Sequence, residues 1–288
     1  MLLISAIVIA RNEGADLRRT VECLEATLPA ESEIVVVDDG SSDGCAGSLA
    51  ADGRVRMVRS DGVGVAQARN RGAAQARGQI LVFADAHITA EPGWWKPLVK
   101  LLEAPSIGAV APVIADAVEP ECKAYGVGLA GPDLTIEWLQ QRGESPYPVP
   151  ILPGCCLAMR QDTFQAAGGF DDGLICWGGV DNELGVRLWL LGYELLVAPE
   201  VEVRHQFRTE RPFPVEWSWV LHNRLRLAFL HFSAPRIARV VEALRGHEDF
   251  AAAVALTVES DVAARRAQLA SRRLYDDEWF FRRFELQW

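Results

Sequence analysis

Hydrophobic and polar blocks alternate through the first third of the chain, and their spacing predicts strands that alternate with helices. Four apolar runs are typical of buried strands: 2–10, 33–37, 55–58 and 79–84. Apolar residues at helical spacing predict a helix over 15–28, and an Ala-rich segment predicts another from 62 to 76. This β-α-β-α-β-α-β order predicts an α/β fold with a mostly parallel sheet flanked by helices on both faces.

The rest of the chain predicts less regular structure that ends in helices. Residues 105–150 are richer in Pro and Gly and predict loops and short strands. Further short elements are predicted in a row: helices over 163–168 and 181–191, and strands over 195–199 and 201–204. In the second of these helices, Glu183 and Arg187 form an i,i+4 pair. From 216 the pattern is helical nearly to the end, so we expect a first domain over 1–230 and a helical C-terminal extension over 231–288.

Polar side chains stand where the predicted strands end, at Asn12, Asp38, Asp39, Asp85 and His87. In open sheets of this kind, ligands bind at the carboxyl ends of the strands. Residues i and i+2 of a strand share a face, so the carboxylate and the imidazole of Asp85-Ala86-His87 point the same way. One oxygen and one nitrogen ligand suit Mn²⁺ or a similar divalent ion, with open positions for phosphate oxygens. The alternative is a strand-end Asp beside an incidental His.

Charge and composition narrow the function classes. Half of the 288 residues are hydrophobic and 24% are charged, as in a globular protein with a sizeable core. The net charge of −10 argues against nucleic acid as a partner. It would also repel a diphosphate substrate, unless a bound cation offsets it locally.

The cysteines and the apolar runs bear on the compartment. The six cysteines show no C-x-x-C and no paired spacing of a zinc site or a disulfide framework, so we expect reduced thiols. No basic segment precedes the first strand, so we expect no signal peptide. No stretch approaches about 18 uninterrupted apolar residues, so we expect no transmembrane helix. The expected location is the cytoplasm.

A second cluster follows the Pro- and Gly-rich region, at Trp177-Gly178-Gly179-Val180-Asp181. The two glycines allow a backbone to approach a ligand closely. Asp181 falls near a predicted helix start, where it is either an N-cap or a general base in an acceptor cleft.

The third cluster is His205-Gln206-Phe207-Arg208, directly after a predicted strand. His205 is either a remote third metal ligand or a structural histidine, and Arg208 is placed to stabilise charge on a departing diphosphate. Residues 209–214 look like a surface loop that closes over a ligand.

Asp38-Asp39 and Arg69 each have more than one interpretation. The two carboxylates either serve a Gly-Ser-Ser turn or accept hydrogen bonds from a base or a ribose. Arg69, in the middle of a predicted helix, either pairs with Asp38 or contacts a nucleotide, or is a solvated surface residue.

An ordered set of motifs covers roughly residues 3–230 and carries a family resemblance. In chain order they are AIVIARNE (6–13), VDDGSSD (37–43), FADAH (83–87), GWWKPL (93–98), LTIEW (134–138), GGFD (168–171), WGG (177–179), RLW (187–189), HQFR (205–208) and NRLRLA (223–228). Together they resemble the glycosyltransferase A (GT-A) fold of nucleotide-diphospho-sugar transferases. The similarity is specifically to the catalytic domain of polypeptide N-acetylgalactosaminyltransferases (family 27) and their family 2 relatives.

The resemblance implies a UDP-sugar donor and Mn²⁺ (or Mg²⁺) held by Asp85, His87 and His205. It implies uracil or ribose contacts from Asp38 and Asp39, and it suggests that Trp177 and Arg208 line the diphosphate and the sugar. The donor site expected from it comprises Ala10, Asn12, Glu13, Asp38, Asp39, Arg69, Asp85, Ala86, Gly178 and Gly179, with Asp181, Arg208 and Trp177 as the catalytic group.

Two departures from the family pattern matter. After Trp-Gly-Gly the family normally has Glu-Asn, where this chain has Val180 and Asp181; the missing Glu would touch the transferred sugar, so the sugar stays open. Asp181 instead resembles the catalytic Asp of inverting family 2 enzymes, whereas the N-acetylgalactosaminyltransferases retain configuration, so the stereochemistry is open too. The basic residue expected just before Gly64 is also absent, since Asp61, Gly62 and Val63 stand there.

The function expected from all this is metal-dependent transfer of a hexose or N-acetylhexosamine from a UDP-sugar to a hydroxyl of an unidentified peptide, glycan, lipid or small-molecule acceptor. One alternative is a nucleotide-sugar-binding protein without transferase activity. Another is a nucleotidylyltransferase, whose usual Gly-rich loop with a following Arg and Lys is replaced here by Arg11-Asn12-Glu13.

The extension mixes aromatic and basic residues, notably at 279–284. We favour packing of these aromatics on the domain or on a second subunit over docking on a membrane surface, which would suit a lipid-linked acceptor.

Overall fold

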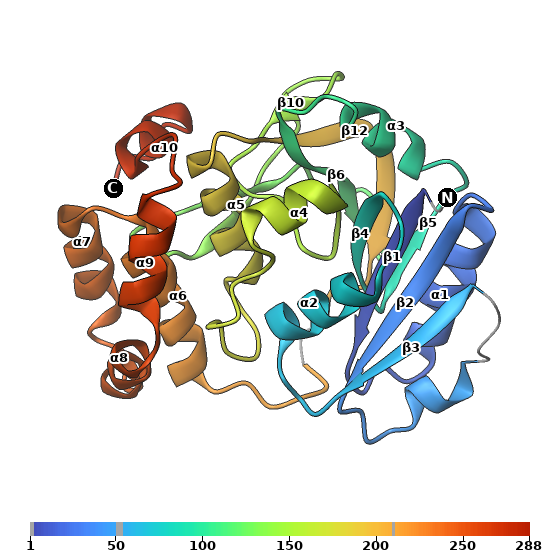
Figure 1. Ribbon diagram of the computed structural model, residues 1–288, viewed down its shortest axis with the longest axis horizontal. Coiled ribbons are helices and arrows are strands. Elements are labelled where there is room, and N and C mark those ends of the chain that lie inside the picture. The colour runs from blue at the N-terminus through green and yellow to red at the C-terminus, as the bar shows by residue number, and fades with distance from the viewer. Residues whose placement is uncertain (1–2, 50–53, 209–210) are drawn as a thin grey trace.

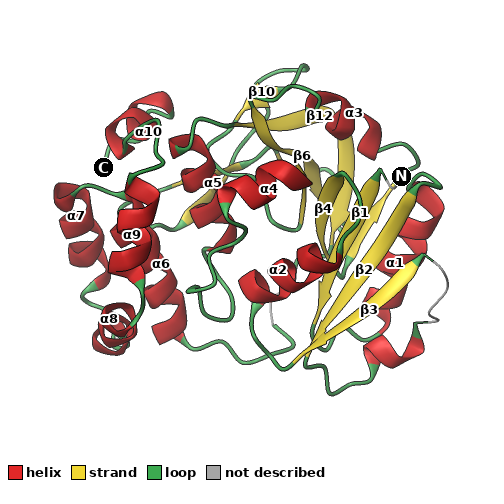
Figure 2. Ribbon diagram, in the orientation of Figure 1, coloured by secondary structure: helices red, strands yellow, loops and turns green. Residues whose placement is uncertain are grey.

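The computed structural model describes residues 3–49, 54–208 and 211–288. A mixed ten-stranded sheet in this part of the chain forms the centre, with its main path in the order β10-β12-β6-β11-β4-β1-β2-β3 (Figures 1 and 2). Helices α1 and α3 cover one face and α2, α4 and α5 the other, while α6 to α10 gather at the end of the molecule away from β3. The predicted α/β architecture with a helical C-terminal part is confirmed.

The N-terminal half follows the predicted pattern closely. Its elements are β1 (Ile4–Ala10), α1 (Ala15–Thr27), β2 (Ser32–Asp39), β3 (Val55–Ser60), α2 (Val65–Gln75) and β4 (Ile80–Asp85). The strands pair in parallel in the order β3-β2-β1-β4. The alternation is wrong at one point, because the described part of the β2–β3 connection holds only a 3₁₀ turn (Cys45–Ser48) and no α-helix. The polar Gly- and Ser-rich segment after Asp39 has no apolar stripe from which a helix could be built.

The second half of the sheet is more regular than its sequence predicts. Its elements are β5 (Ile88–Ala90), α3 (Trp95–Leu101), β6 (Ile107–Asp116), β7 (Lys123–Ala124), β8 (Val127–Leu129), β9 (Ile136–Trp138), β10 (Tyr147–Pro148), β11 (Cys156–Arg160) and β12 (Glu194–His205). Strand β6 is ten residues long and buried, so the prediction of loops and short strands over 105–150 is wrong there. The two strands predicted over 195–204 are one strand with a register shift between Ala198 and Glu202. Strand β11 runs antiparallel between β4 and β6, so parallel pairing holds only for β3-β2-β1-β4 and for β6 with β12.

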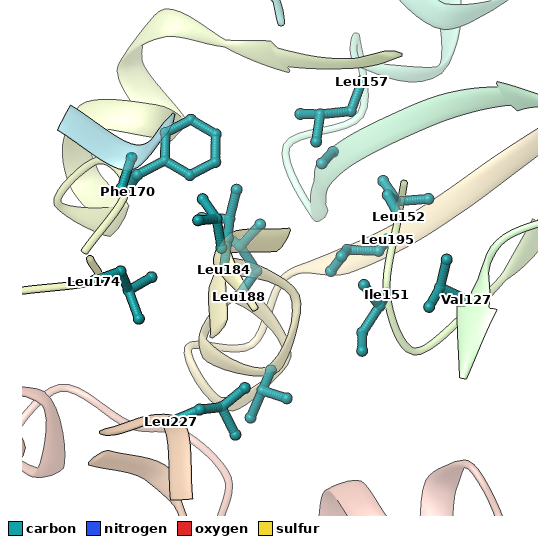
Figure 3. Packing of buried hydrophobic residues seen from close by; sticks show 14 of the residues in the cluster. Val127, Ile151, Leu152, Leu157, Phe170, Leu174, Leu184, Leu188, Leu195 and Leu227 are labelled. Carbon is teal, nitrogen blue, oxygen red and sulfur yellow. The ribbon is translucent and has the colours of Figure 1, made fainter. Parts of the chain in front are cut away.

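Alternation along the strands builds a hydrophobic core on each face of the sheet. Ile7, Val35 and Phe83 belong to the cluster under α2, α4 (Gln161–Ala167) and α5 (Val180–Leu190). Their strand neighbours, such as Val8 and Val36, belong to the cluster under α1 and α3. Figure 3 shows the first cluster, in which leucines of α5 meet side chains of the sheet and of α6.

All the C-terminal helices but α9 share that first core, and α9 packs on Leu230 in a small cluster of its own. The C-terminal helices are α6 (Trp217–His231), α7 (Ala234–Leu244), α8 (Phe250–Glu259), α9 (Val262–Ala270) and α10 (Asp277–Arg283). On α10, Phe280 and Phe281 are buried in the cluster that α5 also joins, and the rings of Trp279 and Phe284 lie 6.1 and 5.0 Å from that of Trp189. These aromatics therefore pack on the domain, as favoured above. The boundary at 230 stays a prediction, since α6 runs across it.

The predicted Glu183–Arg187 pair forms, and it is fully buried. Arg187 donates from Nε and Nη2 to the two carboxylate oxygens of Glu183, at 2.8 Å each. His231 Nε2 lies 2.8 Å from Glu183 Oε1, and Arg273 Nη2 lies 3.2 Å from His231 Nδ1. Burial opposes the charge on Glu183, but Arg187 and His231 hold its pKa well below the usual value; burial lowers the pKa of His231. Neutral His231 thus links the extension to α5.

Within the described residues, we find no helix that combines the length and the apolar character needed to cross a bilayer.

Candidate active site

A cleft of about 460 Å³ opens at the carboxyl ends of β1, β2 and β4 and runs to the start of α5. Its floor is Ile9 and Ala10, and Asp39 and Asp85 line it from the neighbouring strands. Thirteen of the fifteen predicted site residues line this cleft: Ala10, Glu13, Asp39, Arg69, Asp85, Ala86, His87, Trp177, Gly178, Gly179, Asp181, His205 and Arg208. The structure therefore brings these residues together in one cleft, and it adds how they pair, which the sequence does not show.

Asp85, His87 and His205 meet at the end of β4. One ligand atom from each lies within 4.8 Å of the other two, as a shared metal ion requires. Strand β12 carries His205 there, because its last residue pairs with Ile88 of β5. The His87 and His205 ring centroids are 4.7 Å apart, and His205 Nε2 lies 3.4 Å from Asp85 Oδ2.

The donor set fits Mn²⁺. Both ring nitrogens of His205 are buried and have no hydrogen-bond partner within the described chain, and a metal ion would bind to one of them. His87 Nδ1 lies 3.0 Å from Glu13 Oε2, which leaves Nε2 for an ion in the carboxylate–histidine–metal arrangement. Burial would raise the pKa of Asp85, but His205 and Arg69 lower it to about 2, so the ligand is a carboxylate at neutral pH.

Arg69 joins the metal ligands to the second cluster. Its Nη1 donates to Asp181 Oδ1 at 2.8 Å and its Nη2 donates to Asp85 Oδ1 at 3.2 Å and to the Gly154 carbonyl at 2.6 Å. The expected pairing with Asp38 is therefore wrong, because Asp38 serves a turn on the other side. Burial raises the pKa of Asp181, although Arg69 opposes this.

Gly154 is a site residue that sequence reasoning missed. A Cβ at this position would lie inside contact distance of the Asp181 carboxylate, 2.5 Å from Oδ2. Only its place next to Cys155 in an apolar stretch marks it in the sequence, and that is no signal for a site.

Asn12 and Asp38 do not line the cleft. Asp38 Oδ1 accepts from the Ser41 amide at 2.9 Å, which is the turn role left open above. Asn12 accepts from the Ser42 amide at 2.8 Å and donates to the Pro212 carbonyl at 3.1 Å. Both residues hold loops around the cleft, and their donor-binding roles stay predictions.

Asp39 does line the cleft, and its carboxylate is already engaged. It accepts from Ser60 Oγ at 2.7 Å and from the amides of Val63 and Gly64 at 2.8 and 2.9 Å. These bonds fix the loop that leads into α2.

The cleft mouth carries aromatic and cationic side chains. Arg208 is held by Glu13 and Asp16 at 2.8 and 2.6 Å. The Arg211 guanidinium stacks on the Trp177 ring, 3.6 Å from its centroid. Of the loop predicted over 209–214, residues 209 and 210 lie outside the described chain, and Arg211, Pro212 and Phe213 border the cleft.

Two family models match the chain. The model described as glycosyl transferase family 2 matches residues 5–167, more than half of the chain, and the one described as the N-terminal domain of galactosyltransferase matches 141–212. This chain belongs to glycosyl transferase family 2.

Similar curated proteins include polypeptide N-acetylgalactosaminyltransferases. The chain is 30% identical over 238 residues to putative polypeptide N-acetylgalactosaminyltransferase 13 of Drosophila melanogaster, covering 73% of this chain and 42% of that protein. It is 31% identical over 253 residues to polypeptide N-acetylgalactosaminyltransferase 11 of Xenopus tropicalis, covering 78% and 42%. The family 2 chain thus spans about two fifths of the length of these relatives.

Solved structures confirm the GT-A fold. GalNAc-T7 with UDP, GalNAc and Mn²⁺ matches with a TM-score of 0.80 and 22% identity, over 98% of this chain and 56% of that one. The mannosyltransferase PcManGT from Pyrobaculum calidifontis, in complex with GDP-Man and Mn²⁺, matches with a TM-score of 0.58 and 18% identity, over 98% and 83%.

Proposed function

We propose that the chain is a metal-dependent glycosyltransferase that moves a hexose or N-acetylhexosamine from a UDP-sugar to an acceptor hydroxyl. The observation that carries this is the convergence of Asp85, His87 and His205 in a cleft that Arg69 connects to Asp181. The relatives' names and the UDP, GalNAc and Mn²⁺ of the GalNAc-T7 structure support the same chemistry.

The leaving diphosphate is the first demand of such a transfer. Bound Mn²⁺ or Mg²⁺ would supply a Lewis acid that offsets charge on the diphosphate. Asp85, His87 and His205 would hold the ion, and Glu13 would orient His87. Arg208 lies at the same end of the cleft, where Glu13 and Asp16 fix its guanidinium beside the path of the departing group.

Positioning and deprotonation of the acceptor is the second demand, and we assign it to Asp181. Its Oδ1 is held by Arg69, which leaves Oδ2 to accept the acceptor's hydroxyl proton. The acceptor oxygen then bonds to the anomeric carbon while the bond from that carbon to the diphosphate oxygen breaks, and UDP leaves. A direct displacement of this kind inverts the anomeric configuration. NMR spectroscopy of the product determines that configuration. Retained configuration would remove Asp181 from the role of base.

The proposal is tested by calorimetric titration of UDP with and without Mn²⁺, on wild type and on His87→Ala, followed by a donor-hydrolysis panel. We expect Mn²⁺-dependent UDP binding that is lost in the variant, and slow hydrolysis of one UDP-sugar, which identifies the sugar. Absence of UDP binding at millimolar Mn²⁺ would refute the UDP-sugar assignment. UDP-sugar binding without hydrolysis or transfer would favour the binding protein without activity.

The location we propose is the cytoplasm. All six cysteines are free thiols, as is usual in a reducing compartment. A tagged full-length chain should fractionate with a cytoplasmic marker, and recovery from the medium or from a membrane lumen would contradict the proposal.

A further inference from the structure

Arg11 stands at the carboxyl end of β1 and belongs to no role described so far. It follows Ala10 directly and lines the cleft together with Asp39 and Asp85. Its side chain lies over Gly62, since a Cβ built on Gly62 would be 3.5 Å from both Nη1 and Nη2. The guanidinium therefore fills the place that a side chain at 62 would take.

An aromatic ring also lies near this guanidinium. Arg11 Cζ is 5.7 Å from the centroid of Phe213, so the planar group lies close to both Gly62 and the ring. Asp39 accepts hydrogen bonds from the amides of Val63 and Gly64. The loop beside Arg11 is therefore held in place without a ligand.

Arg11 differs from most other arginines of the cleft because no carboxylate of the described residues pairs with it. Arg69 is paired with Asp85 and Asp181, Arg208 with Glu13 and Asp16, and Arg224 lies 3.8 Å from Asp133. Arg11 has no carboxylate or hydrogen-bond partner in the described part of a chain whose net charge is −10. Its five donors are left for a ligand.

We propose that Arg11 binds the nucleoside diphosphate of the donor, in the place of the basic side chain that is missing from 61–63. The inference rests on the proposed function. A guanidinium matches phosphate oxygens and base carbonyls with the same planar fork, and an unpaired one in a mostly acidic protein favours an anionic ligand. Arg11 is thus a donor-binding residue that the sequence motifs do not mark.

The test is calorimetric binding of UDP and of uridine in Mn²⁺ to wild type, Arg11→Gln, Arg11→Lys and Arg71→Gln. Arg71 is exposed on α2 and does not line the cleft, so its variant is the matched control for net charge. We expect Arg11→Gln to weaken UDP binding about tenfold or more, Arg11→Lys to lose about threefold, and Arg71→Gln to stay within about twofold. A loss for UDP alone places the contact at the phosphates, and a loss for both ligands places it at the base or the ribose.

Arg11→Gln that binds UDP within about twofold of wild type overturns this inference and leaves the proposed function intact. A wild-type chain that binds no UDP overturns both. Thermal unfolding controls for folding, and if Arg11→Gln does not fold, Arg11→Lys decides: equal affinity to wild type then overturns the assignment.

Discussion

Replacing Gly154 by alanine is the most direct test of where Asp181 must stand. The added Cβ would overlap Asp181 Oδ1 and would lie 2.5 Å from Oδ2, whereas ordinary contact begins at 3.4 Å, so the carboxylate must move by more than about 1 Å. The backbone at 154 has an ordinary φ, so the change introduces crowding without backbone strain. The Gly154 carbonyl still accepts from Arg69, which keeps Arg69 close to its place.

The expected cost falls on the chemical step. A misplacement of about 1 Å costs roughly a hundredfold in rate, which is about 2.7 kcal/mol of activation free energy. Overpacking at this site should cost about 1–3 kcal/mol of folding free energy, a smaller concern in a domain with this much core. The metal ligands are untouched, so the Kd of UDP in Mn²⁺ should stay within about threefold.

The assay is UDP release at saturating donor, with kcat and KM determined for wild type, Gly154→Ala, Asp181→Asn and the double variant. Gly143→Ala is the matched control, since a Cβ there meets nothing within 4 Å. If Gly154→Ala acts through Asp181, the double variant should be no slower than Asp181→Asn alone. Wild-type kcat in Gly154→Ala, or losses that simply multiply in the double variant, would refute the reasoning.

Three further predictions concern the metal site, acid stability and the C-terminal helices. Glu13→Gln should weaken Mn²⁺ affinity about 10–100-fold in a spin-resonance titration, because His87 loses its orienting carboxylate; unchanged affinity would contradict this. His231 and Glu183 have pKa values below their usual 6.5 and 4.5, so the folded chain binds fewer protons than the unfolded one. The free energy of unfolding therefore decreases as the pH decreases. Urea unfolding should show a loss that begins below about pH 6.5 and grows below about pH 4.5, and a flat profile would disprove the linkage. Phe281→Ala should lower the free energy of unfolding by about 3–5 kcal/mol, and a loss under about 1 kcal/mol would mean that α10 is not part of the core.

Long apolar runs made the N-terminal half of the fold predictable. Strands β1, β2 and β4 are buried at all but one position each, and each contains an unbroken hydrophobic run, so the run itself shows the strand. Strand β6 is buried as well, but five of its ten residues are Gly, Ala or Pro, which are typical of loops and small-residue helices as much as of strands. Burial between β11 and β12 decides its structure, and burial is not a local property.

The candidate site was predictable where its chemistry is local and not where it depends on packing. Asp85 and His87 are two residues apart on one strand, so a single motif carries both ligands. Arg69 meets Gly154 and Asp181 across 85 and 112 positions of the chain, and no pattern in the sequence records that meeting. The resemblance supplied His205 in advance, but the open place that Gly154 leaves for Asp181 is visible only in three dimensions.

The contacts from Glu183 through His231 to Arg273 have a consequence for truncating this chain or exchanging its C-terminal helices. Glu183 lies two residues after Asp181 on α5, and its buried charge depends partly on an imidazole at the end of α6, which Arg273 in turn caps. A chain cut near 230 would keep the transferase motifs but would lose His231. The buried carboxylate of Glu183, two residues after Asp181, would then lack one of its partners. The C-terminal helices are therefore not a detachable module. A chimera that exchanges them for those of a relative would have to bring the matching histidine and arginine along.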